Sequence, residues 1–317
     1  MFPPIEPFKT GHLQVDNSHS IYWEASGNPS GKPAIFLHGG PGAGGLKGYR
    51  KMFDPEKYLI LYLDQRGCGN SRPLAHESRD LSSNHTQALI GDIETLREHL
   101  GIKQWLVTGG SWGTTLAFAY AQAHTQRVTG LVLSSITTTS KEEVQWITED
   151  VGALFPQQWD EFAAVVKDFK GERLVDRYYQ AITSVDPGVR AMAAEAWCKW
   201  EDTHVSLDPN WKLSLSIADA GFKLLFATLV IHYWKHAGFL SDTPILDRMS
   251  ILAKIPGVLL HGRYDVSSPL RTAWELHKRW PGSRLVVIES EGHGGPQMSE
   301  EMCRAISAFA ECGHGSL

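Results

Sequence analysis

Short apolar runs alternate with longer stretches of helical spacing over most of the chain. The apolar runs are bounded by Gly and Asp and lie at residues 33–40, 58–67, 104–110, 128–135, 257–265 and 284–293. Stretches such as "TQALIGDIETLREHLG" at 86–101 separate them. This alternation predicts βαβ units whose parallel strands are buried on both faces. We therefore expect an α/β fold with a mostly parallel central sheet flanked by helices.

Two segments depart from this alternation. Residues 12–28, "HLQVDNSHSIYWEASGN", alternate polar and apolar positions around a turn, which predicts an antiparallel hairpin at the sheet edge. From about residue 137 to about residue 247 the chain has helical spacing, many Trp, Glu, Phe and Ala residues and no convincing pair of strands. We interpret residues 137–247 as a helical cap domain, inserted into an α/β-hydrolase core domain formed by residues 1–136 and 248–317.

Composition excludes several classes of function. The chain has 317 residues, of which 42% are hydrophobic and 21% charged, so it can bury a full core. A formal net charge of −5 without a cluster of Lys and Arg argues against nucleic acid or an anionic membrane surface as a partner. The most apolar long segment, residues 220–234, contains Lys223 and His232. It is too short to cross a bilayer, which needs about 20 apolar residues.

The N-terminal sequence and the cysteines predict a cytoplasmic protein. The start "MFPPIEPFKTGHLQVD" carries prolines and acids where a signal peptide has a basic and then an apolar run. Cys68, Cys198, Cys303 and Cys312 are scattered without a CxxC pair, which argues against a disulfide framework or a structural zinc site. We expect reduced thiols.

The stretch "VTGGSWGTTLA" at 107–117 contains the first candidate for chemistry. Residues 109–113 fit the pattern G-x-S-x-G around Ser111, directly after a predicted strand and directly before a predicted helix. In such a turn the serine has a strained backbone, and its small neighbours prevent collisions between side chains. The hydroxyl is then exposed at a helix N-terminus, which favours developing negative charge. The alternative is a turn that only joins strand to helix.

A serine nucleophile needs a base that takes its proton and an acid that orients the base. Both are expected after later core strands, in the order Ser, Asp, His. Asp265 follows the run "GVLLH", and His293 ends the run "RLVVIESEGH", with a helical stretch between them. A turn-capping aspartate and a surface histidine are the alternatives, but they do not explain the joint occurrence in this order. The sequence therefore predicts a Ser111-His293-Asp265 catalytic triad.

Acyl transfer also needs donors for the negative charge that develops on the carbonyl oxygen. Fixed backbone donors are worth about 2.7 to 4 kcal/mol each in activation free energy. One candidate is the N–H of Trp112, and the other comes from "HGGPGAGG" at 38–45, where we favour Gly40 and place Gly39 second. This loop lacks both the Gly-Lys-Ser/Thr ending of a P-loop and the G-x-G-x-x-G register, which argues against nucleotide binding.

These motifs together resemble one known family. "HGGPG", "DQRGCGNS" at 64–71, "GGSWG", "GRYD" and "GH" occur in the order and spacing of prolyl iminopeptidases, α/β-hydrolase-fold serine peptidases that release an N-terminal proline from peptides. The resemblance covers about residue 28 to about residue 297. It implies no metal or organic cofactor, and it implies the roles given above to Ser111, His293, Asp265, Gly40 and Trp112.

The resemblance also implies an amine-binding site in the cap. Similar enzymes bind the free α-amine of the substrate with two acidic residues, the first in a "WE" motif matched by Trp200 and Glu201. The second precedes an "HYF" motif, matched here by "HYW" at 232–234, and the corresponding position is Val230. One of two expected carboxylates is therefore missing, which makes the binding of an amine cation less favourable. The alternative for Glu201 is an exposed helix acid beside Lys199.

The expected pocket for the proline ring departs from the family too. The chain has "SSIT", ending at Thr137, where similar enzymes have "RGIF", and Ser268 where a Cys commonly stands. Both changes add hydroxyls where a pyrrolidine needs apolar contact. The expected substrates are small peptides or amino-acid amides and esters. A carboxylesterase or amidase with an altered substrate range is the main alternative, and a ligand-binding protein with little turnover is a third that the intact triad argues against. The sequence predicts no oligomeric state.

Three other features have structural interpretations. Asp64 and Arg66 of "DQRG" are expected to brace neighbouring loops, with a role in catalysis as the alternative. His232 and His236 share one helix face, as a metal pair would, but no Glu lies between them and we favour a structural role. We expect the many cap tryptophans to pack the cap, with a few lining the cleft.

Overall fold

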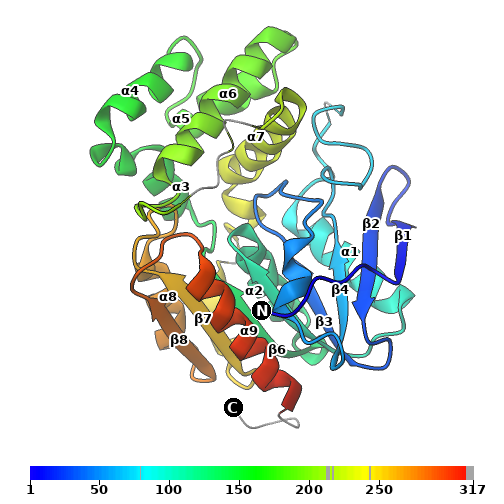
Figure 1. The fold of residues 1–317 in the computed structure, drawn as a ribbon. Coiled ribbons are helices and arrows are strands. Elements are labelled where there is room, and N and C mark those ends of the chain that lie inside the picture. Colours follow the sequence, from blue (N-terminus) through cyan, green and yellow to red (C-terminus); the bar gives the residue numbers. More distant parts are fainter. Residues whose placement is uncertain (79, 212–214, 216–217, 243, 312–317) are drawn as a thin grey trace.

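The computed structural model describes residues 1–317 except 79, 212–214, 216–217, 243 and 312–317. Within that part of the chain, eight strands form one sheet in the order β1-β2-β4-β3-β5-β6-β7-β8 (Figure 1). β2 is antiparallel to both of its neighbours, and the other neighbouring pairs are parallel. The predicted α/β fold with a mostly parallel sheet is confirmed.

The strands lie close to the apolar runs of the sequence. They are β1 (Lys9–Gln14), β2 (Ser20–Gly27), β3 (Lys32–Leu37), β4 (Tyr58–Leu63), β5 (Trp105–Gly110), β6 (Val128–Ser134), β7 (Gly257–Gly262) and β8 (Ser283–Ile288). β1 and β2 form the predicted edge hairpin, with Leu13 opposite Ile21. Several predicted runs extend past the observed strands, because the polar residues that end them belong to loops at the carboxyl edge of the sheet.

Helices cover both faces of the sheet. α1 (Thr86–His99), α2 (Trp112–Ala123) and α8 (Leu270–Arg279) lie on one face, and α9 (Pro296–Glu311) lies on the other (Figure 1). Short 3-10 helices occupy Gly48–Met52, Thr125–Arg127, Asp150–Ala153, Ala237–Phe239 and Ile245–Leu252. In β3, Ile35 belongs to the cluster beneath α1 and α2, whereas Phe36 belongs to the cluster beneath α9. Burial on both sides explains why the strands are continuously apolar.

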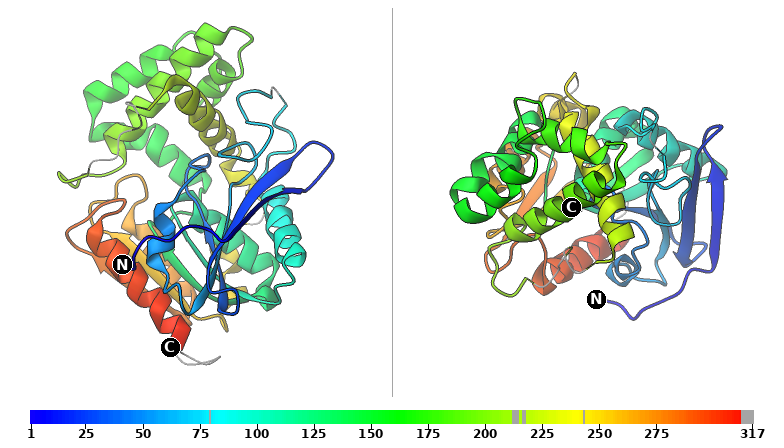
Figure 2. Two further views of the ribbon diagram at one scale, coloured as in Figure 1. Left: turned by 45° about the vertical axis from the view of Figure 1, so that its right-hand side comes forward. Right: turned by 90° about the horizontal axis from the view of Figure 1, so that it is seen from above.

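Among the described residues, five α-helices lie between β6 and β7 along the chain. They are α3 (Lys141–Thr148), α4 (Pro156–Val165), α5 (Leu174–Ile182), α6 (Pro187–His204) and α7 (Ala220–Lys235). Figures 1 and 2 show them gathered beyond the carboxyl ends of the parallel strands. They bury a hydrophobic cluster of their own, which includes Phe162, Tyr178 and Trp197. They occupy the interval interpreted as the cap, and its exact bounds at 137 and 247 stay a prediction.

Two further sequence expectations concern the thiols and the membrane. Cys68, Cys198 and Cys303 are buried free thiols, and Cys312 lies outside the described residues. Among the helices that the structure describes, none has both the length and the apolarity that a bilayer span requires.

Candidate active site

Ser111 stands in a strained turn between β5 and α2. Its φ of 56° and ψ of −130° lie in a region that residues other than glycine rarely adopt. The turn packs closely against the end of β3, because a Cβ on Gly113 would lie 2.1 Å from the carbonyl oxygen of Leu37. The hydroxyl of Thr114 donates a hydrogen bond of 2.8 Å to the Ser111 carbonyl. The chain therefore has the strand-turn-helix that the G-x-S-x-G pattern predicts.

Asp265 and His293, 28 residues apart in the sequence, lie side by side. Nδ1 of His293 is 2.9 Å from Oδ2 of Asp265, and Oδ1 of Asp265 accepts the N–H of Ser268 at 3.0 Å. Burial by itself lowers the pKa of His293, but the charge of Asp265 and its hydrogen bond raise this pKa by more. A carboxylate at Nδ1 fixes the proton there, which leaves Nε2 free to accept a proton from a nucleophile.

Two residues that were not predicted from the sequence, His261 and Ser135, hydrogen-bond the backbone of the loops that carry Asp265 and His293. His261 accepts the N–H of Ile136 at Nδ1, at 3.0 Å, and donates from Nε2 to the carbonyl of Ser268, at 2.7 Å. The hydroxyl of Ser135 donates to the carbonyl of His293 at 2.7 Å. His261 stands in the same apolar run as Asp265, where a buried histidine among aliphatic residues was a signal that could have found it.

The glycine-rich loop after β3 passes close to the nucleophile. A Cβ on Gly39 would lie 3.2 Å from Cβ of Ser111, and Gly40 has a φ of +110°, which only glycine adopts readily. The N–H of Gln65 donates to Nε2 of His38, so the proton of this ring is on Nδ1, which donates to the Gly39 carbonyl at 2.9 Å. Because a trans peptide directs C=O and N–H to opposite sides, this bond fixes the direction of the Gly40 N–H.

Gln65 connects the glycine-rich loop to the residue after the nucleophile. Its side-chain nitrogen donates to the carbonyl of His38 at 2.9 Å, and its side-chain oxygen accepts from the indole of Trp112 at 2.8 Å. Trp112 is the first residue of α2, so its backbone N–H has no partner within the helix. Both predicted sources of oxyanion donors are thus tied to one buried side chain. Gln65 was not among the residues predicted from the sequence, although its neighbours Asp64 and Arg66 were.

Asp64 and Arg66 have the bracing contacts expected of them. The carboxylate of Asp64 accepts the N–H of Gly45 at 2.6 Å and the N–H of Asn70 at 2.7 Å. The guanidinium of Arg66 donates two hydrogen bonds, of 2.6 and 2.7 Å, to Asp92. All three charged residues are buried, and such charges are stable only when they are paired and hydrogen-bonded. These contacts support the structural interpretation of "DQRG".

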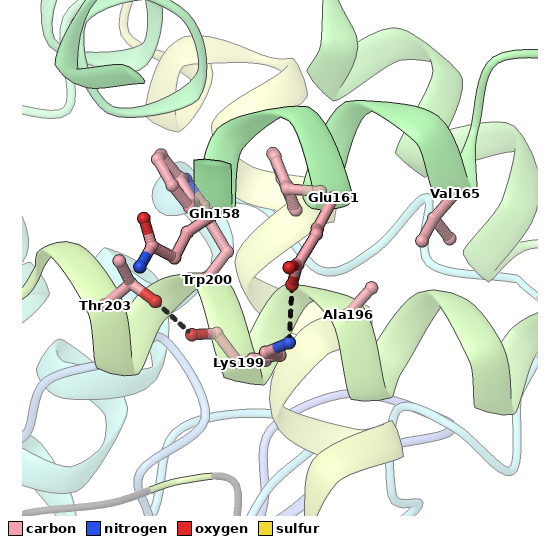
Figure 3. A pocket seen from close by; sticks show the side chains of 8 residues that line it. Gln158, Glu161, Val165, Ala196, Lys199, Trp200 and Thr203 are labelled. Carbon is pink, nitrogen blue, oxygen red and sulfur yellow. Dashed lines mark hydrogen bonds and ion pairs between the residues drawn. The ribbon is translucent and has the colours of Figure 1, made fainter. Parts of the chain in front are cut away.

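Glu201 lies on the last turn of α6 with its side chain only 13% exposed. Its Oε1 accepts the indole N–H of Trp197 at 3.1 Å. Burial raises the pKa of Glu201 to about 7, although the Trp197 hydrogen bond and the charge of His293 act to lower it. The alternative of an exposed acid beside Lys199 is wrong, since Lys199 pairs with Glu161 at 2.7 Å on the outer side of the cap (Figure 3).

The other four residues expected to contact substrate are buried and have structural surroundings of their own; they are Trp200, Thr137, Ser268 and Val230. Trp200 donates its indole N–H to the carbonyl of Ile147, and Val230 packs in the cap cluster. The hydroxyl of Thr137 donates to a buried carboxylate in α3, and that of Ser268 donates to a backbone carbonyl. Contact with a substrate stays a prediction for these four residues.

Two further features of the cap lie apart from the triad. A pocket of about 130 Å³ opens between α4 and α6, and of the predicted site residues it includes Trp200 alone (Figure 3). His232 and His236 each hydrogen-bond a backbone carbonyl, at 2.8 Å. In the described ranges of the chain, His, Cys, Asp and Glu side chains nowhere gather in threes as metal ligands would.

Comparison with known proteins identifies close relatives of the whole chain. A family model described as "alpha/beta hydrolase fold" matches residues 32–296. "Proline iminopeptidase" of Arabidopsis thaliana is 43% identical over 307 residues, which cover 95% of this chain and 80% of that protein. "Proline iminopeptidase" of Neisseria gonorrhoeae is 41% identical over 311 residues, 96% of this chain and 97% of that one.

Solved structures with lower sequence identity share the fold. The crystal structure of a proline iminopeptidase of Mycobacterium smegmatis has a TM-score of 0.62 at 21% identity, over 95% of this chain and 97% of that one. The structure of VinJ has a TM-score of 0.69 at 20% identity, over 96% and 99% of the two chains. At such identities these structures support the architecture alone.

Proposed function

Because the chain belongs to the proline iminopeptidase family of the α/β-hydrolase fold, we infer that it is a serine aminopeptidase that releases an N-terminal residue, preferentially proline. Its substrates are small peptides and amino-acid amides or esters. The observation that carries the proposal is the 2.9 Å pair of His293 and Asp265 on the same sheet edge as the strained Ser111. A binding protein has no need of this arrangement.

The proposed reaction proceeds through an acyl-enzyme. Oγ of Ser111 attacks the carbonyl carbon after the N-terminal residue, while Nε2 of His293 takes the hydroxyl proton and then gives it to the leaving amine. Asp265 holds the ring and stabilises its positive charge. The N–H groups of Trp112 and Gly40 stabilise the oxyanion. Water, activated by His293, then hydrolyses the ester to Ser111 and releases the amino acid.

Recognition of a free N-terminus is assigned to Glu201. An exopeptidase must favour substrates whose α-amine is unblocked, and a buried carboxylate meets that need when it is ionised. The low exposure of Glu201 and its electrostatic interaction with His293 support this role. The second candidate function is a carboxylesterase. It is favoured by Val230, a buried aliphatic residue where the family resemblance implies a second carboxylate.

The test is steady-state hydrolysis of three substrates: proline 4-nitroanilide, the same compound N-acetylated, and a short-chain 4-nitrophenyl ester. The proposal expects cleavage of the free anilide and at least a hundredfold lower kcat/KM for the acetylated one. Turnover of the ester with both anilides intact would establish the esterase instead. Ser111→Ala is expected to lose activity at least a thousandfold, and retention of full activity by this variant would overturn the mechanism.

A further inference from the structure

His204 is a buried histidine that lies beside the Glu201 carboxylate. Its side chain is 1% exposed, and neither Nδ1 nor Nε2 has a partner among the described residues. Nε2 is 3.7 Å from Oε2 of Glu201, one helical turn away in α6. This distance is too long for a hydrogen bond, yet both atoms can lie within about 3 Å of one ligand nitrogen. Unpaired buried polar atoms are rare, so the two ring nitrogens of His204 point to a polar ligand.

The pair lies next to the loop that carries Asp265. Directly after His204 the chain leaves α6 and runs along this loop, where Ser206 forms a β-bridge with Asp265 and Leu207 donates its N–H to the carbonyl of Tyr264 at 3.0 Å. The charges of His293 and Asp265 act on His204 as well. His204 and Glu201 therefore lie close to His293 and Asp265, beside which the proposed function places the substrate's N-terminus.

Histidine 204 can accept a hydrogen bond there. Burial lowers the pKa of His204 to about 3, so the ring is neutral and one of its nitrogens carries a lone pair. An N-terminal proline is a secondary ammonium with two N–H donors, whereas other N-terminal residues are primary ammonium ions with three. We propose that Nε2 of His204 and Oε2 of Glu201 each accept one of the two N–H groups of an N-terminal proline.

This assignment rests on the proposed aminopeptidase function and specifies its substrate. His204 supplies the second acceptor that Val230 does not provide. Two acceptors match the two donors of proline, and a primary ammonium leaves one N–H unpaired at this pair. Because an unpaired donor in a dry site is unfavourable, the pair selects for proline at the N-terminus.

The test compares variants on a substrate with the amine and a substrate without it. The first is proline 4-nitroanilide, and the second is the 4-nitrophenyl ester of cyclopentanecarboxylic acid, which keeps the ring and lacks the nitrogen. His204→Leu removes the acceptor at similar size, His204→Gln keeps an acceptor, and Thr203→Val is the control. Thr203 neighbours His204 in α6 but lines the outer pocket (Figure 3).

His204→Leu is expected to raise KM for the proline anilide about tenfold to hundredfold, as for a lost hydrogen bond to a charged group, with kcat within about twofold. Hydrolysis of the cyclopentane ester is expected to stay within about twofold, His204→Gln to recover most of the lost affinity, and Thr203→Val to match the wild type. Equal losses on both substrates would overturn the assignment, since they indicate a structural role.

A measurement on the wild-type enzyme needs no variant to fold. Pyrrolidinium, with two N–H donors, is expected to inhibit proline anilide hydrolysis about tenfold more tightly than N-methylpyrrolidinium, which has one. Equal inhibition by the two cations would overturn the two-acceptor assignment while the aminopeptidase function stands. If the wild type cleaves the ester and not the proline anilide, the proposed function fails and this assignment fails with it.

Discussion

The indole of Trp112 donates a hydrogen bond of 2.8 Å to the side-chain oxygen of Gln65, which joins the residue after the nucleophile to the turn after β4. The same side chain donates to the carbonyl of His38, at the start of the glycine-rich loop. The two proposed oxyanion donors come from segments more than 70 residues apart in the sequence, at Gly40 and Trp112. Gln65 sets the distance between those segments, and we assign it a positioning role.

Gln65→Leu is expected to lower kcat about tenfold to hundredfold with little change in KM, because a misplaced oxyanion donor weakens the transition state more than the bound substrate. The measurement is steady-state hydrolysis of the ester substrate, which avoids effects on amine binding. Gln104→Leu, at an exposed glutamine that bonds the carbonyl of Gln126, is the matched control. A kcat for Gln65→Leu within twofold of the wild type would contradict the positioning role.

The pH profile of kcat/KM is expected to follow the ionisation of His293. Its pKa is raised above 6.5, so the ring is protonated and inactive as a base at low pH, and activity rises as pH increases through this raised value. The profile is measured on the ester substrate between pH 5 and 9. An activity that does not fall toward pH 5 would contradict His293 as the base.

Asp265→Asn is expected to lower kcat about ten-thousandfold, because the amide no longer fixes the proton on Nδ1 of His293. It also removes the charge that raises the pKa of His293, so the remaining activity is expected to have its rise shifted to lower pH. Glu289→Gln is a matched control, since Glu289 pairs with Arg263 at the exposed end of the same loop region. An unchanged pH midpoint in Asp265→Asn would exclude the expected coupling.

Glu201 is expected to make KM for the proline anilide depend on pH. Its pKa is raised to about 7, so at lower pH the carboxyl is neutral and loses its attraction for the ammonium, which stays protonated below about pH 8. KM is expected to rise about tenfold for each unit below pH 7, whereas KM for the cyclopentane ester stays flat. Parallel changes in the two KM values would count against Glu201 as the amine partner.

The raised pKa of Glu201 also makes the stability of the protein depend on pH. As pH rises, stability falls, whereas binding of the substrate amine improves. The folded protein holds the Glu201 proton more tightly than the unfolded chain, whose value is 4.5, so the wild type loses stability as pH rises from 4.5 through 7. Glu201→Gln does not ionise. It is expected to be more stable relative to the wild type at pH 8 than at pH 4.5, by at most about 3 kcal/mol. Urea unfolding of both proteins at pH 4.5 and at pH 8 measures their free energies of unfolding. If the variant differs from the wild type by the same amount at both pH values, the expected effect is excluded.

Two glycine substitutions in helices are expected to have opposite effects. Gly113→Ala places a Cβ 2.1 Å from the Leu37 carbonyl, so either the nucleophile turn or β3 must move, and a loss of about 3 kcal/mol or more in stability is expected. Gly91→Ala, in α1, places its Cβ more than 4 Å from every described atom outside the neighbouring helical backbone and is expected to stabilise the protein by about 1 kcal/mol. Thermal unfolding of both variants checks the pair. A folded, unimpaired Gly113→Ala would contradict the close approach.

The sequence predicted the fold and the residues proposed for catalysis because their signals are local. A buried parallel strand is continuously apolar, and the turn after it must provide glycines where the backbone crowds. Ser111, Asp265 and His293 each follow such a strand. Because these strands are parallel, their carboxyl ends place the three residues at one edge of the sheet. Other local patterns predicted the edge hairpin, from alternating polar and apolar positions, and the helical interval between β6 and β7, from helical spacing.

Only the tertiary structure revealed what surrounds those residues. The role of Gln65 follows from its hydrogen bonds to His38 and Trp112, which lie in two other segments. That of His261 follows from its hydrogen bonds to the backbone of Ile136 and Ser268. His204 stands three residues after Glu201, a spacing that places two side chains on one helix face. That its ring has no hydrogen-bond partner among the described residues is visible only in the folded structure. Local patterns determine strands, turns and order in the chain, whereas hydrogen-bond partners and desolvation depend on which distant segments pack together, and that is decided by the folded structure.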